Sequence, residues 1–171
     1  MTRKQTPSNQ EKEFALRRVV YDVLIAVKSL VEIPQVRRDF SKKESLKISA
    51  LIMVRNLNAF LYHTDYGHCD DIHSGDFGLT CWAPAANAAL GKRLKERINK
   101  LVGHVVTSRP DPFKDDQEVS DVALPLIHES CEFIRHCRKV GGVGYRGAAK
   151  GYVLQLNSLL PMLGFTVIPE N

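Results

Sequence analysis

Residues 43–62, KESLKISALIMVRNLNAFLY, form the most apolar periodic segment of the chain. Their apolar side chains fall on most of the circumference of a helix, and a helix with this pattern is buried on nearly all sides in a folded protein. The segment therefore predicts a helix at the centre of a bundle.

Four other segments fit helices packed around this one. Apolar residues recur at three- and four-residue steps in residues 11–32, 86–106 and 117–138, and residues 148–163 form a shorter helical segment. The sequence contains no internal repeat and no strand-rich block. Helical segments joined by loops pack helix on helix, so we expect an all-α, single-domain bundle of four to five helices.

Proline and small polar residues mark the expected helix ends. Pro34 should end the first helix, because proline cannot donate the next backbone hydrogen bond. Ser41 or Ser45 is expected to cap the second helix, since a serine hydroxyl accepts the free amides of a first turn. Asp115 or Asp116 is expected to cap the fourth helix in the same way.

The connection after the second helix is unusually long. Residues 63–84 are rich in Gly, Asp, His and Ser, which predicts a long ordered loop of the kind that often carries function. Residues 1–10 are polar and are predicted to form a disordered N-terminal tail, which leaves residues 11–171 as one helical domain. The composition, 44% hydrophobic and 25% charged, is that of a globular protein with a packed core.

The formal net charge is +5. A positive surface concentrates anions, so we expect RNA or another anionic partner. The start of the chain does not read as a secretory signal, and the apolar residues 19–31 are too short for a membrane span and contain Asp22 and Lys28. The four cysteines lack the dense spacing of a disulfide scaffold. The sequence predicts a cytoplasmic protein with reduced thiols and no membrane partner.

Arg55 and Asn56 interrupt the central apolar helix. An arginine in a mostly buried helix needs a carboxylate to offset its desolvation, and Asp70, Asp71 and Asp76 lie in the loop that follows. One interpretation is an internal clamp that orders this loop. The other is an anion site, because a guanidinium also matches the geometry of phosphate.

The third predicted helix carries polar groups near its end. Arg97, Asn99 and Lys100 precede His104, and Lys100 and His104 are four residues apart, so they share a helix face. A histidine at this place is stabilised as a cation by the helix dipole. Alternatively, it serves as a general acid or base, because its pKa lies near neutral pH.

Two further patterns are weaker. Zinc-ligand residue types crowd the long loop, but they lack the spacing of a known zinc frame, so no metal is expected. These residues are His63, His68, Cys69, Asp70, Asp71, His73, Asp76 and Cys81. Residues 142–147 match G-x-G-x-x-G without a preceding strand, so we expect a flexible basic loop and no nucleotide cofactor. A phosphate bound at the following helix start is the alternative.

The arrangement of Arg55-Asn56 in a central helix, the Asp residues in the loop, and Ile98-Asn99-Lys100 before His104 resembles the HEPN superfamily. HEPN proteins are helical bundles, many of which cleave RNA without metal, with an Arg, a polar neighbour, and a His four to six residues on. Residues 46–109 also resemble bacterial proteins related to phage abortive-infection HEPN modules. Two departures are visible: His63 lies one residue too far from Arg55, and Ile98 replaces the polar neighbour of Arg97.

The resemblance implies a metal-independent ribonuclease or an RNA-binding protein in bacterial defence, acting as a homodimer. His104 would be the base toward a ribose 2′-hydroxyl, and Arg55 or Arg97 would stabilise the phosphate, with Asn56 as the remaining catalytic candidate. Asn99, Lys100 and Arg109 are the expected substrate-binding residues. The alternative is a non-catalytic helical module for dimerisation or protein interaction.

Overall fold

The computed structural model describes residues 7–36, 38–62, 72, 74–77, 93–101, 112–140 and 148–169. The helices are α1 (Asn9–Glu32), α2 (Phe40–Tyr62), α4 (Pro112–Val140) and α5 (Ala148–Leu159), and residues 93–101 form a further helix. Short 3₁₀ turns are η1 (Ile33–Gln35), η2 (Ser74–Phe77) and η3 (Leu160–Leu163). The described residues contain no strand, which confirms the prediction of an all-α bundle.

The start of α1 follows from its capping residues. The Glu11 amide donates to Ser8 Oγ at 3.3 Å, and the Ser8 amide donates to Glu11 Oε2 at 2.7 Å. This reciprocal pair is a capping box, which satisfies two backbone donors at once. The helix therefore begins at Asn9, two residues before the expected start at residue 11. Residues 1–6 of the predicted tail lie outside the described residues.

The prediction of a serine cap on α2 is wrong. The Lys42 amide donates to Asp39 Oδ1 at 2.9 Å, so Asp39 supplies the cap. Ser41 and Ser45 lie inside the helix, where the Ser45 hydroxyl donates to the Ser41 carbonyl at 2.9 Å. Asp39 accepts the hydrogen bond from the first turn because it lies directly before the first helical residue, Phe40.

The fourth predicted helix is longer than expected. It begins at Pro112, where the missing proline amide is not needed for a helical hydrogen bond. Asp116 therefore lies within α4 and not at its cap, which corrects the sequence prediction. The same helix passes through Pro125.

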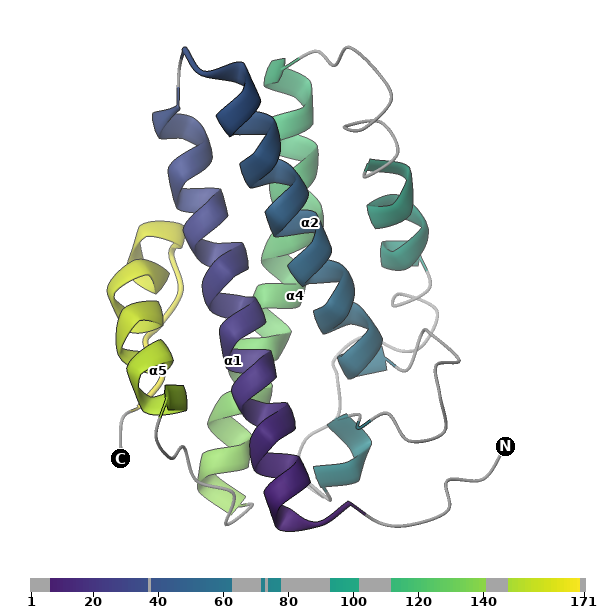
Figure 1. The fold of residues 1–171 in the computed structure, drawn as a ribbon, viewed down its shortest axis with the longest axis vertical. Coiled ribbons are helices and arrows are strands. Elements are labelled where there is room, and N and C mark those ends of the chain that lie inside the picture. The colour runs from purple at the N-terminus through teal and green to yellow at the C-terminus, as the bar shows by residue number, and fades with distance from the viewer. Residues whose placement is uncertain are drawn as a thin grey trace.

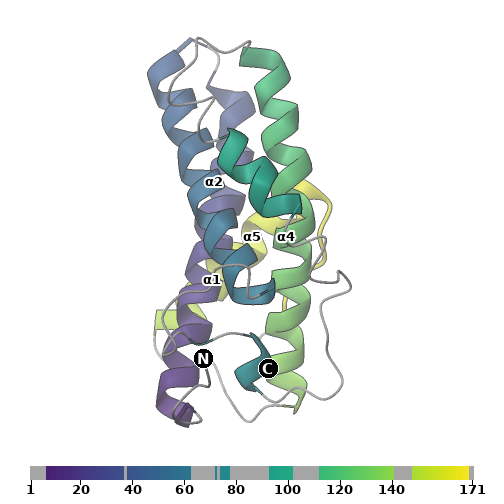
Figure 2. The ribbon, with the colours of Figure 1, turned by 90° about the vertical axis from the view of Figure 1, so that its right-hand side faces the viewer.

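The long helices form an antiparallel layer. In Figure 1, α1 runs in one direction, and α2 and α4 run in the other. The α5 helix lies against α1 at one side of this layer, and the 93–101 helix lies at the other side. Figure 2 shows the 93–101 helix in front, across α2 and α4, with α5 behind. The two outer helices are thus on opposite sides of the bundle.

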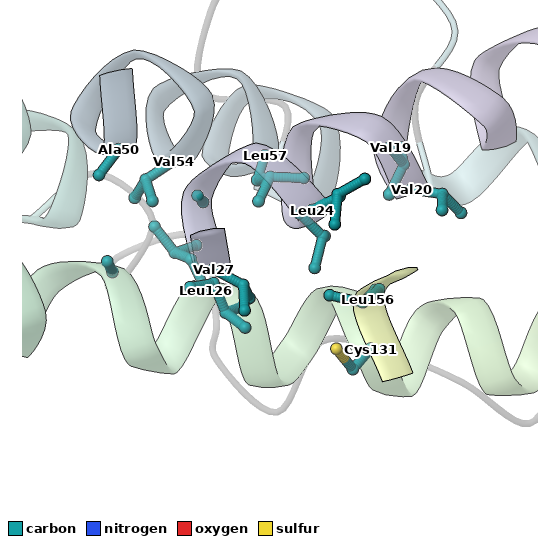
Figure 3. Packing of buried hydrophobic residues seen from close by; sticks show 14 of the residues in the cluster. Val19, Val20, Leu24, Val27, Ala50, Val54, Leu57, Leu126, Cys131 and Leu156 are labelled. Atoms are coloured by element: carbon teal, nitrogen blue, oxygen red, sulfur yellow. The ribbon is translucent and has the colours of Figure 1, made fainter. Parts of the chain in front are cut away.

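Side chains from all five described helices form the core, and Figure 3 shows part of it. Leu24 of α1 lies beside Leu57 of α2, and Val27 of α1 lies beside Leu126 of α4. Leu156 of α5 joins the same buried cluster. On α1 the buried apolar positions recur every three or four residues, as the sequence pattern predicts.

A cluster of aromatic rings fixes η2 to the core. The Phe77 ring packs edge-on against Phe133 at 5.1 Å and Phe60 at 6.0 Å between centroids. The Ser74 hydroxyl donates to the Leu61 carbonyl at 3.0 Å. These contacts hold one turn of the predicted long loop against α2 and α4.

The C-terminal segment folds back along the bundle. Gly164 has φ of 78°, a left-handed conformation that favours glycine and ends the helical segment. Asn157 then forms two hydrogen bonds with the backbone of Ile168, both at 2.8 Å. Its side-chain NH₂ donates to the Ile168 carbonyl, and its side-chain oxygen accepts from the Ile168 N–H. Across the described ranges, no helix has both the length and the apolar character needed to cross a bilayer.

Candidate functional site

The 93–101 helix presents a row of cations to solvent. Arg93, Arg97 and Lys100 are exposed, and their spacing of four and three residues places them on one helix face. Leu94, Ile98 and Leu101, each one residue further along the chain, are buried on the neighbouring face. We call Arg93, Arg97 and Lys100 the basic stripe. The buried positions agree with the apolar period predicted for residues 86–106, over the part of that segment that is described.

The buried leucines and isoleucine explain why the basic stripe faces outward. The hydrophobic side chains favour packing over α2 and α4, where the helix lies in Figure 2. The cations are then directed away from the bundle, where their charges stay hydrated. Glu96 and Asn99 are also exposed on this helix. The helix carries four basic residues and one acid over residues 93–101, so its outer surface attracts anions.

Several predicted site residues are not placed. His104 and Arg109 lie outside the described residues, as do Asp70 and Asp71 of the proposed clamp. Arg97 and Lys100 share one face of the 93–101 helix, and Asn99 is exposed on another face of it. The His104 position is therefore known only from the sequence, three residues after the last described residue of that helix.

Asn56 is placed on the interface between α1 and α2. Its side-chain amide donates to Asp22 Oδ2 at 3.5 Å, and Arg18 Nε lies 3.1 Å from Asp22 Oδ1. Asp22 is only 3% exposed. Burial raises the pKa of this carboxyl, while the charge of Arg18 and the hydrogen bonds from Asn56 and Arg18 act in the opposite direction. Asn56 therefore serves as a partner of a buried carboxyl.

The expectation that Arg55 is buried is wrong. Arg55 is exposed, and so is Ile52 one turn earlier on the same face of α2. This face points away from α1 and α4, which pack on the opposite side of the helix. Because the guanidinium remains in water, the desolvation that was expected to require a carboxylate clamp does not arise.

Lys47 is the buried cation of α2, and sequence reasoning missed it. Its side chain is 0% exposed, and its Nζ lies 2.9 Å from Glu44 Oε1 and 3.0 Å from Asp116 Oδ1. Lys43 Nζ lies 2.5 Å from the second oxygen of Asp116. We call these four residues the lysine-carboxylate cluster. It joins the beginning of α2 to the beginning of α4.

The charge balance of this cluster favours the protonated amine. Burial alone lowers the pKa of Lys47, but the hydrogen bonds and charges of Glu44 and Asp116 outweigh it, so the pKa is raised. An enclosed, protonated lysine is no nucleophile or base. Lys47 falls on the buried stripe of Ala50, Leu51 and Val54 at three- and four-residue spacing, but apolar residues on the other faces of α2 hide this stripe in the sequence.

No family model, curated protein or solved structure matches this chain. Among the described residues, no group of three or more His, Cys, Asp or Glu side chains is arranged to hold a metal ion. Apart from Asp76, the zinc-ligand types of the long loop lie outside the described residues, and so does the glycine run 142–147. The basic stripe is thus the candidate site that the described geometry defines best.

Proposed function

We propose that the protein binds RNA through the basic stripe. The observation that carries this proposal is the exposure of Arg93, Arg97 and Lys100 along one face of a helix whose neighbouring apolar face is anchored in the core. Because the helix that carries these cations is already anchored, phosphate binding does not first have to order its backbone. The choice of RNA over other polyanions rests on the resemblance to HEPN proteins.

The length of the basic stripe sets the size of the expected effect. Seven residues separate Arg93 from Lys100, which is about 10 Å along a helix. Three phosphate contacts to a single strand predict that the logarithm of affinity falls with the logarithm of salt with a slope of about −2. Affinity should then fall about 16-fold when salt rises from about 50 to about 200 mM.

Fluorescence anisotropy with a labelled single-stranded RNA tests this proposal. The variant Arg93→Gln, Arg97→Gln and Lys100→Gln should bind more weakly and lose most of the salt dependence, since each phosphate contact to a single strand contributes about 0.7 units of slope. A matched control carries Lys28→Gln, Arg38→Gln and Lys42→Gln, which remove the same charge from exposed positions elsewhere. If both variants lose equal affinity, only net charge matters and the basic stripe is not the site.

The catalytic part of the proposal concerns His104. Arg97 lies on the helix that leads toward His104, so these two residues form the proposed pair of phosphate stabiliser and general base. Cleavage should persist in a chelator, and His104→Ala should abolish it while leaving RNA affinity unchanged. An intact RNA substrate after incubation with wild-type protein would refute the ribonuclease and leave the RNA-binding proposal in place.

The homodimer follows from the same resemblance and has its own test. Light scattering of purified protein at several concentrations gives the molar mass in solution. A dimer that binds no RNA would support the alternative, a helical module for dimerisation or protein interaction.

A further inference from the structure

A second surface combines aromatic rings with arginines. Phe14, Arg17, Arg18 and Tyr21 occur at three- and four-residue steps along one face of α1. The Arg17 guanidinium lies over the Phe14 ring at 5.1 Å, and that of Arg18 lies over the Tyr21 ring at 5.7 Å. Tyr21 in turn contacts Tyr152 of α5, with ring centroids 5.5 Å apart. We call these five residues the aromatic-arginine surface.

The exposure of this surface is not explained by the packing of the bundle. Phe14 is 63% exposed, although burial of a phenylalanine side chain favours folding. The Arg18 side chain is 58% exposed, and Arg17 is exposed as well. The core is complete without Phe14, because the buried face of α1 begins at Leu16.

The charge of this surface is mainly positive. The stretch from Phe14 to Tyr21 contains two arginines and no acid, and α5 contains Lys150 and no acid, while Glu11 and Glu13 lie on the preceding turn of α1. Asp22, which pairs with Arg18, is buried beneath the surface. An approaching polyanion therefore meets cations and aromatic rings together.

This combination matches the chemistry of an unpaired nucleic-acid strand. Bases stack on aromatic rings and on planar guanidinium groups, while the arginines also attract the phosphates. A base-paired duplex hides its base faces and gains nothing from such rings. A protein partner would also use arginines and aromatics, but the excess of positive charge favours the polyanion.

We infer that the aromatic-arginine surface stacks unpaired bases of a single-stranded RNA. The inference rests on the proposed function and narrows its substrate to strands with free bases. It does not depend on the basic stripe, because α5 and the 93–101 helix lie on opposite sides of the bundle (Figures 1 and 2). In this proposal the basic stripe contacts phosphates, and the aromatic-arginine surface stacks on the unpaired bases.

Two probe strands separate stacking from charge. One is oligo(U), and the other is an abasic ribose-phosphate strand of the same length and label. Phe14→Ala should weaken oligo(U) binding about fivefold or more, since each stacked base contributes about 1 to 3 kcal/mol by alanine substitution. Binding of the abasic strand should not change. Phe40→Ala is the matched control, because Phe40 is also an exposed phenylalanine but lies at the start of α2.

The outcomes distinguish the two proposals. Unchanged oligo(U) binding by Phe14→Ala, or an equal loss for both strands, would overturn the stacking inference. If the Arg93, Arg97 and Lys100 variant still loses affinity in that case, the basic stripe stands alone. A wild-type protein that binds neither strand would instead refute the proposed function itself, and the inference with it.

Discussion

Replacing Lys47 with methionine tests whether the lysine-carboxylate cluster stabilises the fold. Methionine retains most of the apolar stem but removes the charge that contacts Glu44 and Asp116. Removing one partner of a fully buried ion pair costs about 3 to 5 kcal/mol. Here the cost is smaller for two reasons. Asp116 keeps its ion pair with Lys43, and the side chains of Asp116 and Glu44 are 25% and 13% exposed. We therefore expect the free energy of unfolding to fall by about 2 to 3 kcal/mol.

For a domain of this size, such a loss lowers the melting temperature by about 4 to 12 °C. Thermal unfolding followed by far-UV circular dichroism at neutral pH measures it. Lys42→Met is the matched control, since Lys42 is an exposed lysine of the same helix and its replacement should change stability by less than about 0.5 kcal/mol. Adding Glu44→Gln to Lys47→Met should recover part of the loss, because the unpaired carboxylate is then removed.

A result in the other direction would refute this reasoning. If Lys47→Met melts at or above the wild-type temperature, the desolvation of the ammonium outweighs its two contacts, and the cluster is not a source of stability. A loss as large for Lys42→Met would show that the effect comes from net charge and not from burial.

The described contacts lead to three other predictions. Because burial raises the pKa of Asp22, the folded protein binds that proton more tightly than the unfolded chain, so stability falls as pH rises from 3.8 through the raised value. Asp22→Asn should therefore gain stability relative to wild type as pH rises from acid to neutral in urea titrations, and a constant difference across that range would contradict the assignment. Asp39→Ala should cost about 1 kcal/mol in the same titrations, while Ser41→Ala should be nearly neutral, and the reverse order would restore the serine cap. Burial raises the pKa of Cys131 and of Cys137 to about 12, so mass spectrometry after alkylation at neutral pH should find both thiols unmodified until urea unfolds the chain.

The helices were predictable because their apolar periodicity is local. The expected first helix, 11–32, agrees with α1 at its end and differs by two residues at its start. The end is set by Pro34, because proline ends an α-helix in any sequence. The start depends on the hydrogen bonds between Ser8 and Glu11, which are specific to this chain. The start of α2 was misassigned because Asp39, Ser41 and Ser45 are all able to cap a helix.

The side of α2 that faces the core was harder to predict. Apolar residues surround this helix, so its pattern does not show which polar side chains point inward. Arg55 was expected to be buried and is exposed, while Lys47 was overlooked and is enclosed. Asp116 comes from another helix, and one sequence does not reveal such long-range pairs. The cationic face of residues 93–101 was predictable, because both its polar and its apolar positions follow the helical period.

The two polar contacts of α2 also select the alignment of the helices. Asn56 meets Asp22 of α1, and Lys47 meets Asp116 of α4, at separate heights along the same helix. A slide of α2 by one turn, about 5.4 Å, would match apolar side chains with other apolar side chains at little cost. It would also leave a carboxylate and an ammonium buried without partners, which costs several kcal/mol. The two contacts therefore favour one alignment of α2 against α1 and α4. We expect a chain that lacks both contacts to populate bundles in which α2 is shifted along its axis.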